Sequence, residues 1–195
     1  MSDILSMMRF ADQIHTCGNI SDRPVQQWNP AFCGDLPLVI RRDGSWYYNG
    51  SPIQRTALVQ LFSSVLRYEN NGEYYLVTPV EKMRIQVEDV PFVIVAMDAV
   101  HQNGIPGFQL MTQLGDRILL DNNDRWLLRP YERSDGLIPY VEVRHHLNAR
   151  IHQNVYYEMI DKAIEKKVSD KDGITNNEAT EIGLISFNQF FSLEK

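Results

Sequence analysis

The segment from Asp43 to Lys82 constrains the fold most, because turn, helix and strand signals follow one another in it with little spacer. Asp43-Gly44 separates an apolar run from an aromatic one, and this residue pair favours the positive φ angles of a tight two-residue hairpin. Ser51 and Pro52 suit the cap and the first position of a helix, and Asn71-Gly72 indicates a further turn. The segment therefore predicts one compact unit in which a hairpin precedes a capped helix.

Apolar residues at 53–65 recur with helical spacing, so they form a stripe on one face of a predicted helix. Such a stripe is typical of a helix that packs on a sheet. A second amphipathic pattern, at residues 4–14, predicts a short N-terminal helix. Alternating apolar and polar residues at 83–88 predict a half-exposed strand, and the continuous apolar run at 92–97 predicts a central one. We therefore expect an α+β fold that is rich in strands. The apolar stripe of the helix consists of Ile53, Ala57, Leu58, Leu61, Phe62 and Val65.

Composition and charge limit the classes of protein to which the chain can belong. With 44% hydrophobic and 23% charged residues it is typical of a globular protein, and its longest apolar run is far shorter than a membrane helix requires. A formal net charge of −6 argues against binding to nucleic-acid phosphates, which requires a positive surface. The N-terminus lacks the pattern of a secretory signal. We expect a cytoplasmic protein with no membrane span and no nucleic-acid partner.

A weak internal repeat appears when the chain is compared with itself at an offset of 102 positions. The identical pairs are Gly34 and Gly136, Pro37 and Pro139, Val39 and Val141, and Arg42 and Arg144. The apolar stripe of the first helix also coincides with that of a second helix predicted over residues 155–164. Chance can produce four identities as well, so duplication and coincidence both stay open on these residues alone.

Four motifs add a family resemblance. They are DGSW at residues 43–46, GSPIQR at 50–55, LFSSVL at 61–66 and LVTPVEK at 76–82. In this order they resemble the bacterial family catalogued as domain of unknown function 1285. The resemblance implies two small β-rich domains with a duplicated strand-turn-strand-helix core. An N-terminal α+β domain is then expected over residues 1–83, and a C-terminal domain similar to pleckstrin-homology folds over residues 84–195.

The sequence offers little support for catalysis or for a metal site. Neither GxGxxG nor GxxxxGK[ST] occurs, which excludes the common nucleotide-binding loops. His145 and His146 fall on opposite faces of an extended strand, and Cys33 has no adjacent basic residue and is expected to be a packing residue. We predict no catalytic residue, no metal ligand and no cofactor. A small enzyme stays open as a third, weaker interpretation.

The remaining signal is cationic and aromatic. In a duplicated protein, matched arginines near an aromatic side chain suit a planar anionic ligand held between the two halves. The predicted ligand-binding residues are Arg42, Trp46, Arg55, Thr78, Lys82 and Arg144. The alternative is that these cations only form ion pairs with acidic neighbours such as Asp35, Asp43, Glu81 and Asp89.

The leading functional hypothesis is a cytoplasmic ligand-binding protein without catalytic activity. It would sense a nucleotide-like or other anionic small molecule at the domain interface, in the signalling context that the family resemblance implies. The alternative is a protein-interaction adaptor without a small-molecule ligand, in which a sheet edge or groove holds a peptide of a protein partner.

Overall fold

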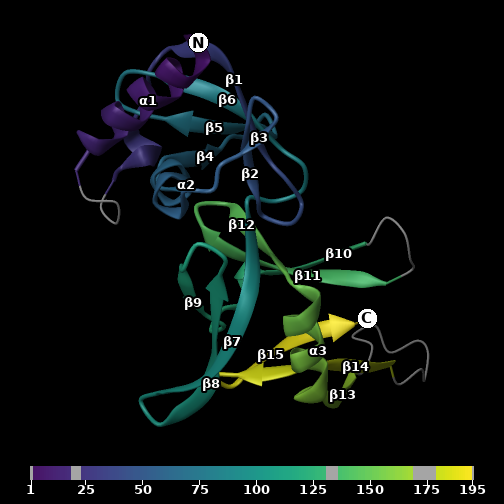
Figure 1. The fold of residues 1–195 in the computed structure, drawn as a ribbon. Coiled ribbons are helices and arrows are strands. Elements are labelled where there is room, and N and C mark those ends of the chain that lie inside the picture. Colours follow the sequence, from purple (N-terminus) through teal and green to yellow (C-terminus); the bar gives the residue numbers. More distant parts are fainter. Residues whose placement is uncertain (1, 19–22, 131–135, 169–178, 195) are drawn as a thin grey trace. The chain divides into compact units, whose positions relative to one another are not determined.

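The computed structural model describes residues 2–18, 23–130, 136–168 and 179–194, which form two compact units (Figure 1). One unit comprises Met1–Pro91 with His145–Leu147, and the other comprises Phe92–Arg144 with Asn148–Lys195. The division therefore lies after Pro91, whereas the boundary expected from the sequence is after residue 83. The reason is that β6 (Lys82–Val87) pairs with two strands of the first unit.

The N-terminal unit is a six-stranded sheet with the strand order β3-β2-β1-β6-β5-β4. All its neighbours are antiparallel except β1 and β6, which run parallel. The remaining elements are α1 (Ser2–His15), η2 (Val25–Gln27), β1 (Phe32–Ile40), β2 (Trp46–Tyr48), β3 (Ser51–Pro52), α2 (Thr56–Ser63), β4 (Leu66–Tyr68) and β5 (Tyr74–Val77).

The core of this unit includes residues of both helices and one face of β1. The Phe10 ring of α1 lies 6.2 Å from the Phe62 ring of α2, and Phe62 is fully buried. On β1, the buried residues Leu36, Leu38 and Ile40 alternate with more exposed neighbours, as the strand period requires. The predicted N-terminal helix is thus confirmed. Of the stripe predicted for the second helix, Leu61, Phe62 and Val65 are buried, whereas Ala57 is exposed.

The predicted helix cap at Ser51 is wrong. The helix α2 begins at Thr56, and no side chain caps it at Arg55. Ser51 instead pairs with Tyr48 in a β-ladder, across a tight turn in which Asn49 and Gly50 have positive φ angles of 47° and 74°. This pairing satisfies the backbone groups of the segment, so strand extension replaces the early start of the helix.

The Asp43-Gly44 turn is present but longer than predicted. The strand β1 ends at Ile40 and β2 begins at Trp46, so the connection is not a two-residue turn. Asp43 closes it by accepting a hydrogen bond from the Ser45 backbone N–H at 2.9 Å, as carboxylates in turns often do.

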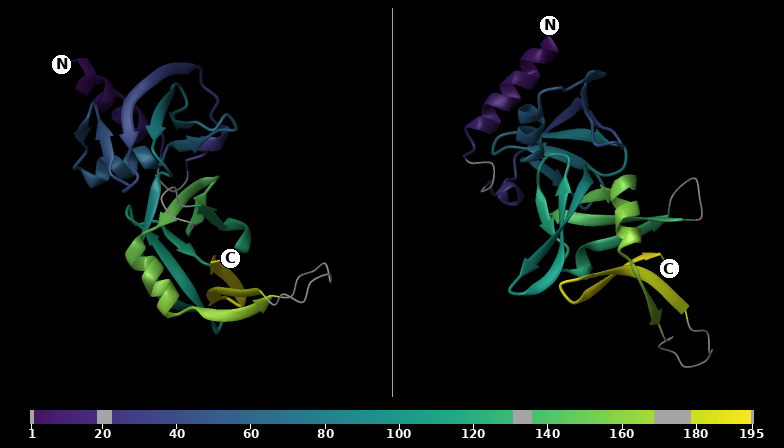
Figure 2. Two further views of the ribbon diagram at one scale, coloured as in Figure 1. Left: turned by 90° about the vertical axis from the view of Figure 1, so that its right-hand side faces the viewer. Right: turned by 60° about the horizontal axis from the view of Figure 1, so that its bottom comes forward.

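The C-terminal unit contains two sheets. The larger has the strand order β10-β11-β12-β7-β8-β9, and the smaller is the meander β13-β14-β15. The helix α3 leads directly into β13 (Figure 2). The elements of the C-terminal unit are β7 (Phe92–Gln102), β8 (Ile105–Thr112), β9 (Arg117–Leu119), η3 (Asn123–Arg125), β10 (Trp126–Pro130), β11 (Leu137–Arg144), β12 (Leu147–Ile151), α3 (Gln153–Asp161), β13 (Ile164–Val168), β14 (Ala179–Ser186) and β15 (Gln189–Glu194).

The two units share an order of elements but not a strand pairing. In each, a hairpin is followed by a helix and then by three antiparallel strands: β1, β2, α2 and β4–β6 in the first, and β11, β12, α3 and β13–β15 in the second. In the first unit β1 pairs in parallel with β6, whereas in the second β12 pairs in parallel with β7. The predicted second hairpin and helix are therefore present, while superposition of the two halves and the likeness to pleckstrin-homology folds stay predictions.

No helix among the described residues combines the length and the apolar character needed to cross a membrane.

The two sheets of the C-terminal unit meet closely at Gly107 of β8. Phe187, in the turn between β14 and β15, donates its backbone N–H to the Pro106 carbonyl at 3.0 Å, and Ser186 Oγ accepts the Phe108 N–H at 2.9 Å. A Cβ atom at position 107 would lie only 2.4 Å from the Phe187 ring. Glycine is therefore required here so that the aromatic ring can approach the strand.

Gly107→Ala is expected to lower the free energy of unfolding by about 1 to 3 kcal/mol, because the added methyl group overpacks this contact. Denaturant unfolding of the single variants and of Gly107→Ala/Phe187→Ala measures the effect. The Phe187→Ala background should remove most of the cost of the alanine at 107. Equal costs in both backgrounds would show that the ring contact is not the cause.

Candidate functional site

Two of the six predicted site residues are buried in the N-terminal unit. The Trp46 side chain of β2 is 2% exposed, and its indole Nε1 has no hydrogen-bond partner. Thr78 is fully buried after β5, and its hydroxyl oxygen accepts the Glu81 backbone N–H at 3.0 Å. Packing and turn closure account for both side chains in the structure.

Three predicted arginines occupy separate elements. Arg42 is half-buried in the turn after β1, and its backbone N–H donates to Glu88 Oε2 at 3.0 Å. Arg55 is exposed just before α2. Arg144 belongs to the C-terminal unit, where its Nη1 lies 2.8 Å from Asp116 Oδ1 and its guanidinium lies over the Phe92 ring. That these residues share one cleft with Lys82 stays a prediction.

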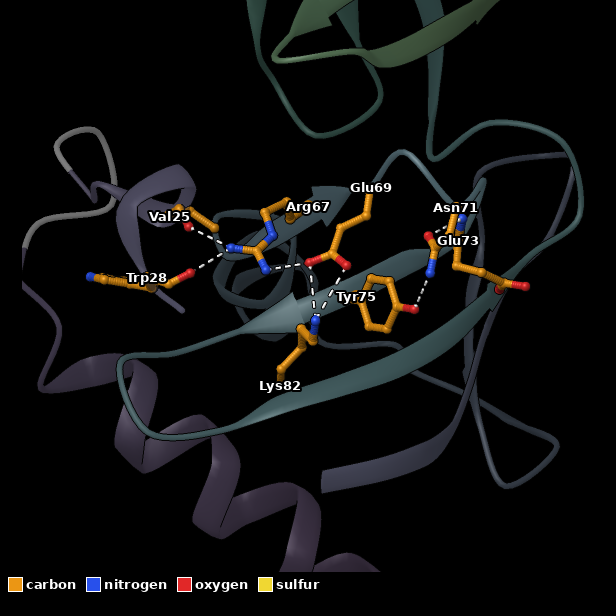
Figure 3. Close-up of polar contacts among 8 residues, drawn as sticks. All are labelled: Val25, Trp28, Arg67, Glu69, Asn71, Glu73, Tyr75 and Lys82. Carbon is orange, nitrogen blue, oxygen red and sulfur yellow. Dashed lines mark hydrogen bonds and ion pairs between the residues drawn. The ribbon is translucent and has the colours of Figure 1, made fainter. Parts of the chain in front are cut away.

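Lys82 lies in a network of charged residues on the N-terminal sheet, which we call the charged cluster: Arg67, Glu69 and Lys82, with the Tyr75 ring beside them (Figure 3). Lys82 Nζ lies 3.3 Å from each Glu69 carboxylate oxygen and 4.9 Å from the centre of the Tyr75 ring. Arg67 Nη2 donates a hydrogen bond to Glu69 Oε1. The carboxylate partner of Lys82 is therefore Glu69, which the sequence analysis did not name.

Strand register brings these residues to one face of the sheet. Arg67 of β4 is paired with Tyr75 of β5, and Lys82 of β6 is paired with Val77 of β5. Because side chains two apart on a strand share a face, Tyr75 and Val77 carry both of their partners to the same side.

Arg67 is the most buried member of the charged cluster, with a side chain that is 9% exposed. Its Nη1 donates to the backbone carbonyls of Val25 at 3.2 Å and Trp28 at 2.6 Å, so it fastens the η2 segment to the sheet (Figure 3). Val25 also joins Tyr75 in a small apolar core against which Trp28 packs. The guanidinium thus has both an ionic and a structural partner.

Two cations share one carboxylate in this cluster, which leaves one positive charge in excess. Burial raises the pKa of the Glu69 carboxyl, but hydrogen bonds from Arg67 and Lys82 and the charges of both cations together hold it below its ordinary value. Glu69 is therefore ionised at neutral pH. The side chains of Glu69 and Lys82 are 24% and 18% exposed, so the cluster can be reached from solvent while being partly shielded from it.

An exposed aromatic ring adjoins the cations. Phe32 of β1 is the strand partner of Lys82, it is 54% exposed, and its ring meets Tyr75 edge-on at 6.3 Å. The Tyr75 hydroxyl in turn accepts a hydrogen bond from Asn71 Nδ2 at 2.8 Å, and Asn71 Oδ1 accepts the Glu73 N–H (Figure 3). The Tyr75 ring, which lies beside both Lys82 and Phe32, is therefore held in place by a hydrogen bond from Asn71 in the β4–β5 turn.

Sequence reasoning found Lys82 but missed Phe32, Arg67, Glu69 and Tyr75. The Asn71-Gly72 turn offered one usable signal, because a hairpin turn sets the register of its strands and so places Arg67 opposite Tyr75. The pairing of Phe32 with Lys82 had no such signal.

The structure places His145, His146 and Cys33 differently from what the sequence predicts. His145 and His146 form the turn between β11 and β12, with φ angles of 44° and 64°, and not an extended strand. Cys33, expected to be a packing residue, is exposed at the start of β1. Among the described residues, no three His, Cys, Asp or Glu side chains gather as a metal site would require.

Comparison with known proteins places the chain in a family. Residues 23–90 match the N-terminal domain, and residues 91–193 the C-terminal domain, of the family described as domain of unknown function (DUF1285). A crystal structure of a DUF1285 family protein from Silicibacter pomeroyi DSS-3 is 34% identical, with a TM-score of 0.78 over 95% of this chain and 94% of that one.

A second crystal structure, of a DUF1285 family protein from Shewanella baltica OS155, is 27% identical, with a TM-score of 0.51 over 63% of this chain and 89% of that one. No match was found among curated proteins. The two matched domains together span most of the sequence, and both are domains of DUF1285. The chain therefore belongs to the DUF1285 family.

Proposed function

We propose that this protein is a ligand-binding protein whose N-terminal unit takes a planar anionic small molecule, such as a nucleotide, at the charged cluster and Phe32. The observation that carries the proposal is the exposed Phe32 ring beside Lys82, which shares the Glu69 carboxylate with Arg67. The ring offers a stacking surface and the cations offer an anion partner within one small area.

The electrostatics of the cluster favour an anion. The whole chain carries a formal net charge of −6, so its overall field opposes an approaching anion unless cations are concentrated locally. The excess positive charge of the cluster supplies this concentration, and partial burial reduces screening by solvent. Lys82 is the accessible contact, because Arg67 is committed to two backbone carbonyls as well as to Glu69.

The aromatic ring favours a planar ligand. Large apolar side chains that stay half-exposed beside polar groups are common at binding sites. A base or similar ring stacked on Phe32 would place an attached phosphate or carboxylate near Lys82, since the two residues are strand partners.

We further propose a cytoplasmic signalling role, in which ligand binding changes how the C-terminal unit binds a protein partner. The C-terminal unit is proposed for this role because of its expected likeness to pleckstrin-homology folds. Arg42, Arg55 and Arg144 are proposed as further contributors to ligand binding. Each can be replaced in the assay below to measure its share.

Thermal-shift measurements with mononucleotides and simple phosphorylated metabolites test the proposal. A ligand at 100 times its dissociation constant adds about 2.7 kcal/mol to the free energy of unfolding and so raises the melting temperature. Lys82→Met should weaken binding roughly tenfold to a hundredfold, because a hydrogen bond to a charged group is lost. Phe32→Ala should weaken the binding of nucleotides more than that of sugar phosphates.

Lys162→Met is the matched control, since Lys162 also pairs with a glutamate, Glu158, but directly follows α3 in the other unit. It should leave binding unchanged. If no anion binds, or if Lys82→Met binds as the wild type does, the site is wrong and the adaptor hypothesis becomes the better one.

A further inference from the structure

The N-terminal unit has a groove of about 640 Å³ that the charged cluster does not use. It is lined by residues of β1 and β6 and by the tips of two turns, at Asn49-Gly50 and at Gly72-Glu73. Its volume falls within the range of small-molecule sites. All of its lining residues belong to this one unit.

The groove lies where the parallel ladder between β1 and β6 loses its register. From Asp35 to Val39 the strand β1 advances four positions, while β6 advances only two, from Arg84 to Gln86. The extra residues of β1 include Pro37, which has no backbone N–H to give to a ladder. The irregular strand and the regular one therefore border an open space in which both expose polar side chains.

The polar wall of the groove is organised around Arg84. Its Nε and Nη2 donate to the two Asp35 carboxylate oxygens at 2.7 and 3.0 Å, and its Nη1 lies 4.0 Å from Glu73 Oε1. The hydrogen bonds from Arg84, and then its charge, hold the pKa of Asp35 below its ordinary value. Two carboxylates thus lie beside one guanidinium, and each keeps lone pairs that can accept further hydrogen bonds.

The charges decide which ligands fit. Two carboxylates against one guanidinium leave a negative excess, so the groove disfavours an anion, in contrast to the charged cluster. A cation is also disfavoured, because the guanidinium lies within 4.0 Å of both carboxylates and competes for them. The wall offers acceptors from Asp35 and Glu73 and amide groups of Asn49 and Gln86, and its apolar floor includes the accessible Pro37 and Val39.

A neutral molecule with several hydroxyl groups matches this wall, since each hydroxyl can both donate and accept a hydrogen bond. Its C–H faces match the apolar floor. We propose that this groove binds a neutral saccharide or similar polyol, independently of the anion site at the charged cluster.

The test is titration of the full chain with glucose, maltose and N-acetylglucosamine, followed by thermal shift and isothermal calorimetry. At least one of these saccharides should bind. Asp35→Ala and Gln86→Ala should each weaken its binding tenfold or more, and circular dichroism should show that both variants keep the wild-type fold, since both residues are exposed. Binding with the same affinity in both variants would overturn the proposal.

Three further measurements separate this proposal from others. Arg117→Met, at an exposed arginine of the C-terminal unit, should bind the saccharide as the wild type does. Lys82→Met should also leave saccharide binding unchanged, so the anion site and the groove fail or succeed separately. No binding by any of the three saccharides, or binding of spermidine in the groove that Asp35→Ala abolishes, would show that the ligand class is wrong.

Discussion

Replacing Phe62 with alanine is expected to lower the free energy of unfolding by about 3 to 5 kcal/mol, a large share of the stability of a small domain. The Phe62 ring is fully buried and lies 6.2 Å from the Phe10 ring, so the substitution removes apolar burial and leaves a cavity between α1 and α2. Denaturant unfolding followed by circular dichroism measures the loss.

Tyr157→Ala is the control for this prediction, because Tyr157 is also an aromatic residue of a helix but is 56% exposed. Its cost should be well below that of Phe62→Ala. A loss of less than about 1 kcal/mol for Phe62→Ala would contradict the packing of α2 on the sheet.

The second large effect is expected at Arg67. Arg67→Met should lower the free energy of unfolding by about 3 to 5 kcal/mol, because it leaves the Val25 and Trp28 carbonyls and part of the Glu69 carboxylate without their donor in a buried setting. The same unfolding measurement applies. Loosening of the η2 segment should also make the first residues of the unit more open to proteolysis.

Arg84→Met is the matched variant, since Arg84 has an ion pair on the same sheet but its side chain is 43% exposed, against 9% for Arg67. Surface pairs of this kind contribute little to the free energy of unfolding, because solvent screens them. The two variants therefore separate burial from charge. Similar losses in both would mean that the backbone contacts of Arg67 do not carry the stability assigned to them.

Local sequence predicts some turns, helices and strands of this chain correctly. Asn71-Gly72 connects β4 and β5 as expected, with a positive φ at Gly72. The helix α1 and the central strand β7 also match their patterns. These features depend on backbone preferences and on the spacing of apolar residues within one segment, so local sequence is enough to predict them.

Local sequence predicts a residue's position wrongly where a local role competes with pairing to a distant partner. Ser51 has the local features of a helix cap, yet pairing with Tyr48 places it in a strand. Trp46 follows a turn and was a candidate for the wall of a site, but its side chain is buried. The family was recognisable from four short motifs, and the motifs themselves do not show which of their residues expose a side chain.

Lys82 shows what each level of structure decided. Its sequence context identified a cation in the polar phase of a strand and nothing more. The Glu69 carboxylate and Phe32 came beside it only through the register of β4, β5 and β6 and the parallel pairing of β6 with β1. Local sequence thus determined the turns, the helices and the strand phases, because dihedral preferences act over a few residues. Tertiary structure decided the cluster and the groove, because pairing between distant strands depends on how the whole sheet buries its apolar face.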